Sequence, residues 1–354
     1  DNDNVPDLGL LGAPATFKNG IAVGASDTSN DYGGSNARPH ARAGFSSTGP
    51  AVDTATVGWE VFSRKAPLLM APGTDNGTTG LDSEYACRTL DNDQTDPVEC
   101  DLVTGANGTS FSSPAAAGAG ALVRDWFAQG FYPDGTSANA GNAGDVVPNI
   151  SGAMVKSMLI ASAEFMRCRN FQTVFGPDND QVCPFTGNLT LDYRFNNEQG
   201  YGRIQLDNAL RLTNWATPIG VIVADGGIPG GINSLSGMTG DVNTLTGETD
   251  TATFTVCDDT QELRVALSWM DTAGSSLNND LDLRLTSPSG NAIYLGNFFS
   301  TDPAGTGSPV VDCPAPLWNS TPNGTPTNSA WSIPSCTTPG TIPNVPDTTN
   351  PTEA

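Results

Sequence analysis

The sequence predicts an α/β domain with a parallel sheet, followed by an antiparallel β domain. Two short apolar segments have the composition of parallel strands that are covered on both faces. A long helical segment rich in alanine and glycine follows them, and later segments alternate apolar and polar residues, as half-buried antiparallel strands do. A chain of 354 residues, 37% of them apolar, can bury two cores. We therefore expect two domains, residues 1–216 and residues 217–354.

The first part of the α/β domain can be placed in order. Residues 21–25 are predicted to form a buried strand, residues 45–50 a turn, and residues 67–73 a second buried strand that a Pro-Gly pair closes. Residues 74–107 are rich in Asn, Asp, Gly and Thr, so we expect them to form a surface excursion.

Helices are predicted next. The helix expected over residues 110–129 is poor in large side chains, and each of its glycines costs roughly 1 kcal/mol relative to alanine. Such a helix needs closely packed neighbouring backbone, so we expect it to be central and buried. Ser151 is a predicted N-cap for a helix over residues 152–163. A short helix is expected to end near Leu212.

Beyond residue 217 the pattern becomes β-rich. Strands are predicted over residues 253–256, 263–269 and 281–285, with clusters of Gly, Pro, Asn and Asp between them. This spacing is typical of a sandwich or a barrel. Residues 310–354 show little periodicity, and we expect loops or an incomplete part of the fold there.

The charge balance argues against a nucleic-acid-binding protein. The chain has 38 acidic and 15 basic residues, with a net charge of -23, whereas nucleic-acid binding needs a basic surface. The sequence contains no run of about 20 apolar residues, which is the length that a membrane-spanning helix needs. We expect a monomer with no nucleic-acid or membrane partner, and so acidic a surface fits an extracellular protein.

Six of the seven cysteines form three pairs that are close in sequence, and Cys257 is left over. This arrangement favours disulfides and a secreted protein, with unpaired buried thiols as the alternative. Metal spacing of the type C-x-x-C is absent. The predicted pairs are Cys87 with Cys100, Cys168 with Cys183, and Cys313 with Cys336.

A serine occurs where the alanine-rich helix is expected to begin, in the segment Gly108-Thr109-Ser110-Phe111-Ser112-Ser113-Pro114. At that position the unpaired backbone N–H groups and the helix dipole would stabilise an oxyanion beside the Ser110 hydroxyl. The residues themselves leave open whether Ser110 is a nucleophile or a helix N-cap.

The same segment resembles the nucleophile motif Gly-Thr-Ser-x-x-x-Pro of subtilisin-like (subtilase, peptidase S8) serine proteases. Further landmarks occur in the family's order: a Val-Gly-Ala strand end, Phe-Ser-Ser-x-Gly-Pro, Ala-Pro-Gly, and a late Gly-Tyr-Gly-Arg segment. They correspond to residues 23–25, 45–50, 71–73 and 200–207. Residues 268–271 and 279–283 resemble the β-sandwich that follows this domain in one bacterial branch of secreted subtilases.

The resemblance implies that residues 1–216 are the C-terminal half of a subtilisin-like parallel-sheet domain. Residues 217–354 would then be an incomplete, jelly-roll-like β-sandwich. The implied activity is hydrolysis of peptide bonds in proteins or peptides through an acyl-enzyme, with Ser110 as the nucleophile and no catalytic cofactor. Thr109 and, more remotely, Asn2 are candidates for support of the oxyanion.

One departure from the family is large. The mechanism needs a general base and an acid that orients it, and the only histidine, His40, lies in an Arg-Pro-His-Ala-Arg segment instead of a His-Gly-Thr motif. We expect His40 to be a surface loop residue. The chain would then be an internal segment of a longer protease that carries the nucleophile without its base, and it should be inactive alone.

Asp271, Asp280 and Asp282 are hard oxygen ligands of the type that calcium prefers, so a structural Ca²⁺ site is a candidate there. The alternative is a solvated strand edge in an acidic protein.

Two further functions stay open. One is a non-catalytic adhesin or lectin, in which tryptophans of the sandwich would bind sugars. The other is a degenerate subtilase without a triad. Asp-(Thr/Ser)-Gly and His-Gly-Thr motifs encoded upstream would favour the active protease over both.

Overall fold

The computed structural model describes the chain in separate ranges, and all structural statements below concern these residues. They are residues 11–27, 41–51, 64–74, 76–79, 102–137, 145–166, 168–170, 181–182, 195–215, 219–226, 232, 249–256, 262–273, 277–288, 292–297, 335–336 and 352–353.

A five-stranded sheet forms the first part of the molecule, with strand order β3-β1-β2-β6-β7. β1 and β3 run parallel, with Val23 opposite Leu69, as the apolar runs predicted. β2 and β6 are also parallel, whereas the β1–β2 and β6–β7 pairs are antiparallel, so the sheet is mixed. The strands are β1 (Val23–Ser26), β2 (Ala41–Arg42), β3 (Leu69–Pro72), β6 (Cys168–Asn170) and β7 (Gln181–Val182).

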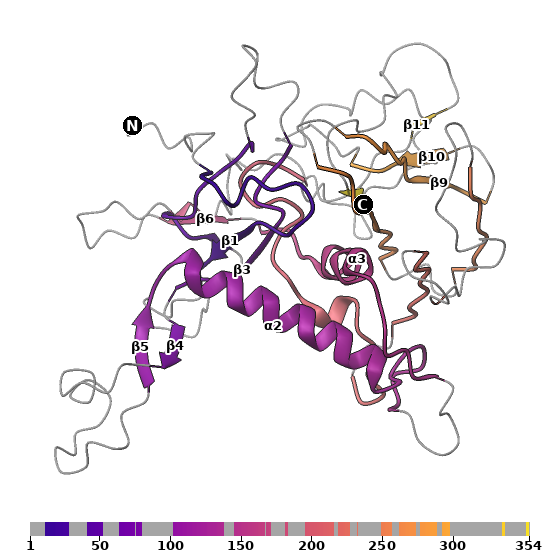
Figure 1. Cartoon of the computed structure of the whole chain (residues 1–354), viewed down its shortest axis with the longest axis horizontal. Helices are drawn as coiled ribbons and strands as arrows, with labels where there is room; N and C mark the ends of the chain where they lie inside the picture. Colours follow the sequence, from indigo (N-terminus) through magenta and orange to yellow (C-terminus); the bar gives the residue numbers. More distant parts are fainter. Residues whose placement is uncertain are drawn as a thin grey trace.

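One helix packs on this sheet, and a second helix packs on the first. α2 (Thr109–Ala128) contacts β1 and β3, and α3 (Gly152–Ser162) contacts α2 (Figure 1). The predicted cap of α3 is confirmed, because the Ser151 hydroxyl accepts a hydrogen bond from the Met154 amide at 2.9 Å. That bond satisfies one of the amide groups that a helix start leaves without an intrahelical partner.

Only one face of α2 is buried, which corrects the expectation of a wholly buried helix. Gly120 lies against α3, where an added Cβ would be 3.4 Å from Val155. On the other face Leu122 is 56% exposed, and nothing described lies within 4 Å of a Cβ added at Gly118. The small residues therefore permit close packing on the α3 side alone.

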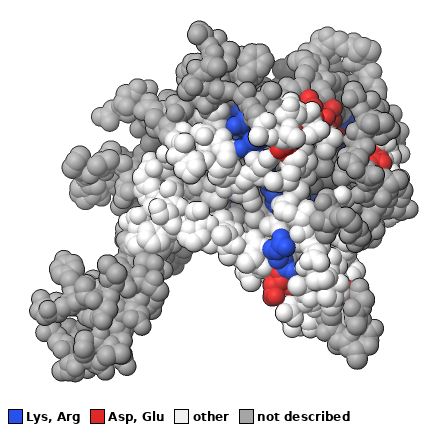
Figure 2. Space-filling view, in the orientation of Figure 1, with Lys and Arg blue, Asp and Glu red and all other residues white. Residues whose placement is uncertain are grey.

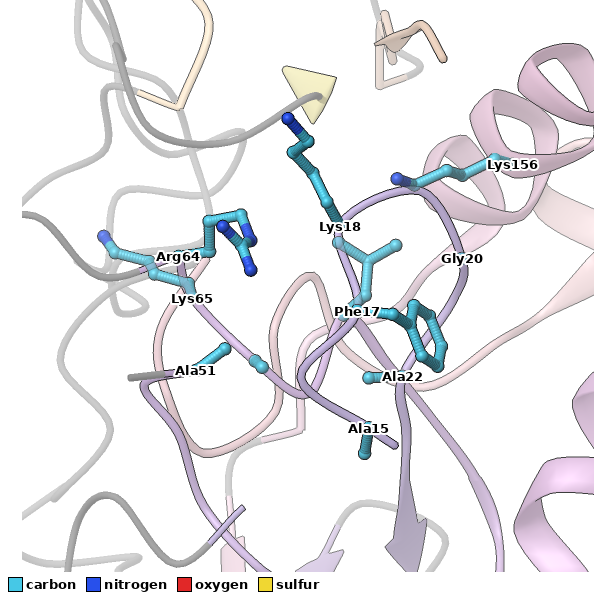
Figure 3. A pocket seen from close by; sticks show the side chains of 11 residues that line it. Ala15, Phe17, Lys18, Gly20, Ala22, Ala51, Arg64, Lys65 and Lys156 are labelled. Carbon is cyan, nitrogen blue, oxygen red and sulfur yellow. The ribbon is translucent and has the colours of Figure 1, made fainter. Parts of the chain in front are cut away.

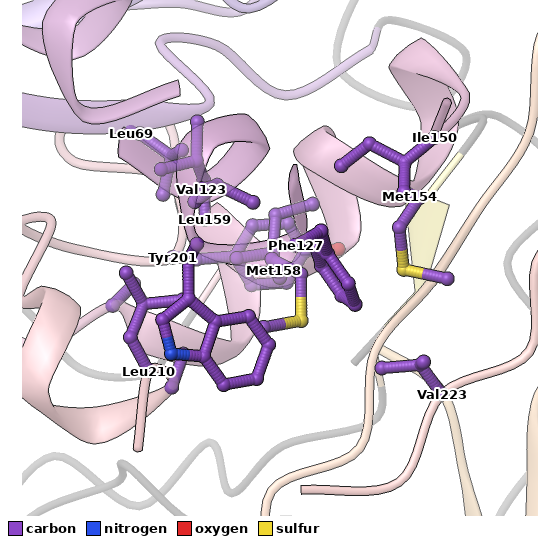
Figure 4. Packing of buried hydrophobic residues seen from close by; sticks show 14 of the residues in the cluster. Leu69, Val123, Phe127, Ile150, Met154, Met158, Leu159, Tyr201, Leu210 and Val223 are labelled. Atoms are coloured by element: carbon purple, nitrogen blue, oxygen red, sulfur yellow. The ribbon is translucent and has the colours of Figure 1, made fainter. Parts of the chain in front are cut away.

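The main core lies between α2, α3 and the segment that follows them (Figure 4). Trp126 and Phe127 meet edge to face with ring centroids 4.9 Å apart, and Phe195 stacks on Tyr201 at 4.2 Å. Val223 belongs to the same cluster although it follows the expected domain boundary at residue 217. The other buried members are Leu68, Leu69, Val123, Tyr132, Ile150, Met154, Met158, Leu159, Ile160, Ala163, Ala209 and Leu210.

The late Gly-Tyr-Gly-Arg segment extends the sheet beside β3. The Tyr201 amide donates to the Leu68 carbonyl at 2.9 Å, and the Met70 amide donates to the Gly202 carbonyl at 2.8 Å. After it comes only a short 3-10 helix, η2 (Leu206–Asn208), where the sequence predicted a helix that ends near Leu212.

The remaining strands are antiparallel. β4 (Asn76–Thr79) and β5 (Leu102–Ala106) form a hairpin within the predicted surface excursion (Figure 1). In the second part, β9 (Arg284–Thr286), β10 (Ala292–Leu295) and β11 (Ser335–Cys336) form one sheet, and β8 (Leu267–Ser268) pairs with β12 (Thr352–Glu353).

The strands predicted after residue 217 are only partly confirmed. Residues 253–256 contain a single bridge residue in place of a strand, and the strand expected over residues 263–269 is reduced to β8. The described strands do not form a complete sandwich, so that architecture stays a prediction. Within the described ranges, no helix combines the length and apolar character needed to cross a bilayer.

Candidate active site

Ser110 is an exposed residue in the first turn of α2. The helix begins after Gly108, whose φ of 150° lies in the region that favours glycine. The Gly108 amide donates a hydrogen bond to the Gly73 carbonyl at 2.8 Å, and the Phe111 amide donates to the Gly108 carbonyl at 3.0 Å. These two bonds hold the start of α2 next to the C-terminal end of β3.

Close packing at Gly73 explains why the Ala-Pro-Gly and Gly-Thr-Ser segments occur together. A Cβ added at Gly73 would overlap the Ala25 Cβ and would lie 2.5 Å from the Ser112 hydroxyl. Glycine therefore lets the first turn of α2 approach both parallel strands. Ser110 is held at the carboxyl ends of β1 and β3, the edge at which open α/β sheets bind their ligands.

The geometry decides against the N-cap interpretation of Ser110. The cap position is Gly108, and Ser110 is the second residue of the helix itself. The cap residue Gly108 has no side chain that could cap α2, and the first turn of the helix contains no acidic residue. The backbone amides of this turn and the positive end of the helix dipole can therefore act on an anion that forms beside Ser110.

A buried polar cluster beside this turn was not anticipated from the sequence. The Thr74 hydroxyl donates to the Asp27 carboxylate at 2.7 Å, and Asp27 is 1% exposed. The hydroxyls of Ser26 and Ser112 are buried without a hydrogen-bond partner from the described part of the chain. The available signal was the change from apolar to polar residues where each strand ends.

The structure places only some of the other predicted site residues. Thr109 is the first residue of α2 and adjoins Ser110, whereas Asn2 and His40 lie outside the described residues. Cys168 lies in β6 and Cys336 in β11, but nothing of their side chains is described. The remaining predicted disulfide partners, Cys87, Cys100, Cys183 and Cys313, lie outside the described ranges, so the pairing stays a prediction.

The three candidate calcium ligands do not come together. Asp271 is buried and forms an ion pair with Lys18 at 2.8 Å, whereas Asp280 and Asp282 are exposed. Across the part of the chain that the structure covers, no three His, Cys, Asp or Glu residues are grouped to hold a metal ion. A structural calcium ion therefore remains an expectation without an assigned site.

Asp271 has a different role. Its carboxylate accepts bonds from the Asn278 amide and from both the amide and the side chain of Asn279, each at 2.9 Å. Burial alone would raise the pKa of Asp271, but the Lys18 ammonium and these amide donors hold it well below its usual range. The carboxylate is thus ionised, and its lone pairs are directed at protein donors.

Comparisons with known proteins identify the family of this chain. The model of the subtilase family (Peptidase_S8) matches residues 2–202. No curated protein matches the chain. Five chains of solved structure are similar to it. One of them is the CspB protease of Clostridium perfringens, with 23% identity and a TM-score of 0.30, over 57% of this chain. This chain spans 28% of the length of that protease chain.

Proposed function

This chain belongs to the subtilase family, and from that premise we propose that it supplies the nucleophile of a serine endopeptidase, with Ser110 as the attacking residue. The observation that carries the assignment is the position of Ser110. It is exposed in the first turn of α2, next to the carboxyl ends of two parallel strands, and the N-cap position of the helix is a glycine. Proteins or peptides are the proposed substrates.

The proposed reaction has two steps. The Ser110 oxygen attacks the carbonyl carbon of the peptide bond, and its proton passes to a general base and then to the departing amine. Water hydrolyses the resulting ester and restores the hydroxyl. The backbone amides at the start of α2 would stabilise the negative charge on the carbonyl oxygen in each tetrahedral intermediate.

We assign the general base and its orienting carboxylate to residues outside this chain. The only histidine is His40, and its Arg-Pro-His-Ala-Arg surroundings lack the family's His-Gly-Thr motif. Residues 1–354 alone should therefore neither hydrolyse casein nor react with a fluorophosphonate, because nothing would take the proton from Ser110.

The test compares two neighbouring serines in the full-length protein. Ser110→Ala should lower peptidase turnover by roughly 10⁶-fold, because the nucleophile is lost. It should also abolish labelling by a fluorophosphonate probe. Ser113 is exposed on the same helix, so Ser113→Ala is the matched control and should retain both activities.

Circular dichroism of the Ser110→Ala protein separates loss of chemistry from loss of fold. Wild-type turnover in folded Ser110→Ala protein would overturn the assignment of the nucleophile. A full-length protein without any hydrolytic activity would instead support a degenerate subtilase.

A further inference from the structure

A cavity lies at the opposite end of the parallel strands from Ser110. Its apolar lining includes Ala22 and Leu68, which immediately precede β1 and β3, and the ring of Phe17 (Figure 3). The cavity volume is about 30 Å³, enough for about two water-sized groups. Its position separates it from the proposed peptidase site, and the inference below does not rest on that function.

The polar lining of this cavity is cationic. The whole chain has only three lysines, Lys18, Lys65 and Lys156, and all three line the cavity together with Arg64. No carboxylate is among the lining residues that belong to the described part of the chain. In a chain with a net charge of -23, four basic residues around one small cavity are an unusual concentration of positive charge.

Three of these cations have interactions elsewhere. Lys18 pairs with Asp271 at 2.8 Å, and Lys65 lies over the Phe195 ring, 5.5 Å from its centroid. The Arg64 guanidinium donates to the Thr16 carbonyl at 3.0 Å. Of the partners named here only Asp271 is negatively charged, and it is not among the described residues that line the cavity.

Lys156 differs from the other three. It is 3% exposed on α3, and no hydrogen bond or ion pair joins its amine to any other described residue. Figure 3 shows its amine extending from α3 toward the loop that carries Lys18 and Gly20. A buried ammonium without a counter-charge is costly, and this burial lowers the pKa of Lys156 to about 8.

We propose that this cavity binds a small oxyanion, either a carboxylate or a sulfate-like group, with Lys156 as its principal ligand and Arg64 as the second. Room, positive charge and a buried amine without a partner are all present at one place. An oxyanion suits this pair, since a guanidinium presents its N–H donors in a planar fork that matches such groups. The anion would supply the counter-charge that Lys156 lacks.

The first test is direct, because the chain has only three lysines. NMR of the 354-residue chain, labelled with ¹³C at lysine Cε, gives three lysine signals whose pH titrations can be followed separately. Among the described residues that line the cavity, the charged ones besides Lys156 are Lys18, Arg64 and Lys65, all cations, and the Asp271 carboxylate is paired with Lys18. Bound anion should therefore raise the midpoint of the Lys156 signal.

The titration is run in sodium sulfate, in sodium acetate and in sodium chloride at equal ionic strength. We expect a midpoint near 8 in chloride and a rise of at least one pH unit in sulfate or acetate, which means that the anion prefers the ammonium form at least tenfold. A larger rise of the midpoint in sulfate would identify a tetrahedral oxyanion as the ligand, and a larger rise in acetate would identify a carboxylate. Equal midpoints in all three salts would overturn the proposal.

A pair of variants provides the second test, with calorimetric titration of the better anion. Lys156→Met keeps the aliphatic stem and removes the charge, so it should weaken binding at least tenfold. Arg284→Gln removes one exposed positive charge on β9, outside the cavity, and should bind like the wild type. Unchanged affinity in Lys156→Met would refute the site. If Lys156→Met does not fold, the titration of the wild-type chain still tests whether the cavity binds an anion.

Discussion

At the scale of single residues, Asp271 is one of the points at which the second part of the chain is attached to the first. Its carboxylate forms an ion pair with the Lys18 ammonium. The side chain of Asp271 is 0% exposed and that of Lys18 is 6% exposed. Asn19 reinforces the contact, because its side chain donates to the Asp271 carbonyl at 2.6 Å and accepts from the Asp271 amide at 2.9 Å. Asp271 therefore joins the two parts of the chain through its side chain and its backbone.

Asp271→Asn should destabilise the folded chain. The substitution removes the negative charge from the buried Lys18–Asp271 pair, and breaking such a pair costs about 3 kcal/mol. Urea unfolding at pH 7 measures the difference. Asp207→Asn, at an exposed aspartate, is the control and should change stability by less than about 0.5 kcal/mol. Equal stability of the two variants would contradict this role.

The same contact predicts a pH dependence. The pKa of Asp271 is lower in the folded chain than its ordinary value of about 4, so the unfolded chain binds its proton first. The stability from this group is therefore fully present above about pH 4 and is lost as the pH falls further. The difference in unfolding free energy between wild type and Asp271→Asn should shrink over that range.

At the scale of elements, the Gly-Tyr-Gly-Arg segment works as an added strand beside β3. Gly200 has a φ of 57°, and a Cβ added there would overlap the carbonyl oxygens of Leu68 and Pro67. Gly202 has a φ of 115°, and a Cβ there would overlap the Glu164 carbonyl. Both glycines are thus required by backbone packing, independently of catalysis.

Gly200→Ala should destabilise the chain by at least about 2 kcal/mol, because the positive φ alone costs about 1–2 kcal/mol for an L-residue and the overlap adds to it. Gly152→Ala is the matched control. Gly152 begins α3 with nothing described within 4 Å of an added Cβ, so this change should be neutral or stabilise by up to about 1 kcal/mol. Urea unfolding of both variants measures the contrast, and similar losses would contradict it.

At the scale of the whole molecule, the strongly acidic composition is not evident on the described surface. The chain carries a net charge of -23, yet charged side chains are few on the described surface shown in Figure 2. The acidic character is therefore not spread evenly over that face. We continue to propose that the protein is secreted, a proposal that rests on the composition and on the three cysteine pairs.

The cysteine pairs give this proposal a measurable consequence. Protein recovered from the medium without reductant should have three disulfides, Cys87–Cys100, Cys168–Cys183 and Cys313–Cys336, each of which could add about 2–4 kcal/mol by restricting the unfolded chain. Intact mass before and after reduction counts the bridges, and peptide mapping identifies them. Complete alkylation without reduction would refute both the pairing and the compartment.

The sequence by itself determined the local elements and the family. The apolar runs predicted β1 and β3 as parallel strands, the alanine-rich segment predicted α2, and Ser151 predicted the start of α3. The position of Ser110 at the start of α2 also followed from the order of residues around it. Such features depend on neighbours within a few residues, which the sequence displays directly.

Only the tertiary structure decided which distant residues meet. Lys18 and Asp271 are 253 positions apart, and no local pattern pairs them. Lys156 is a polar position on a largely apolar helix, and only the fold shows that it lines the same cavity as the other two lysines. Likewise, the exposure of one face of α2 depends on what packs against it. These outcomes arise from long-range packing and from charge burial, which depend on the complete fold and leave no periodic signal in the chain.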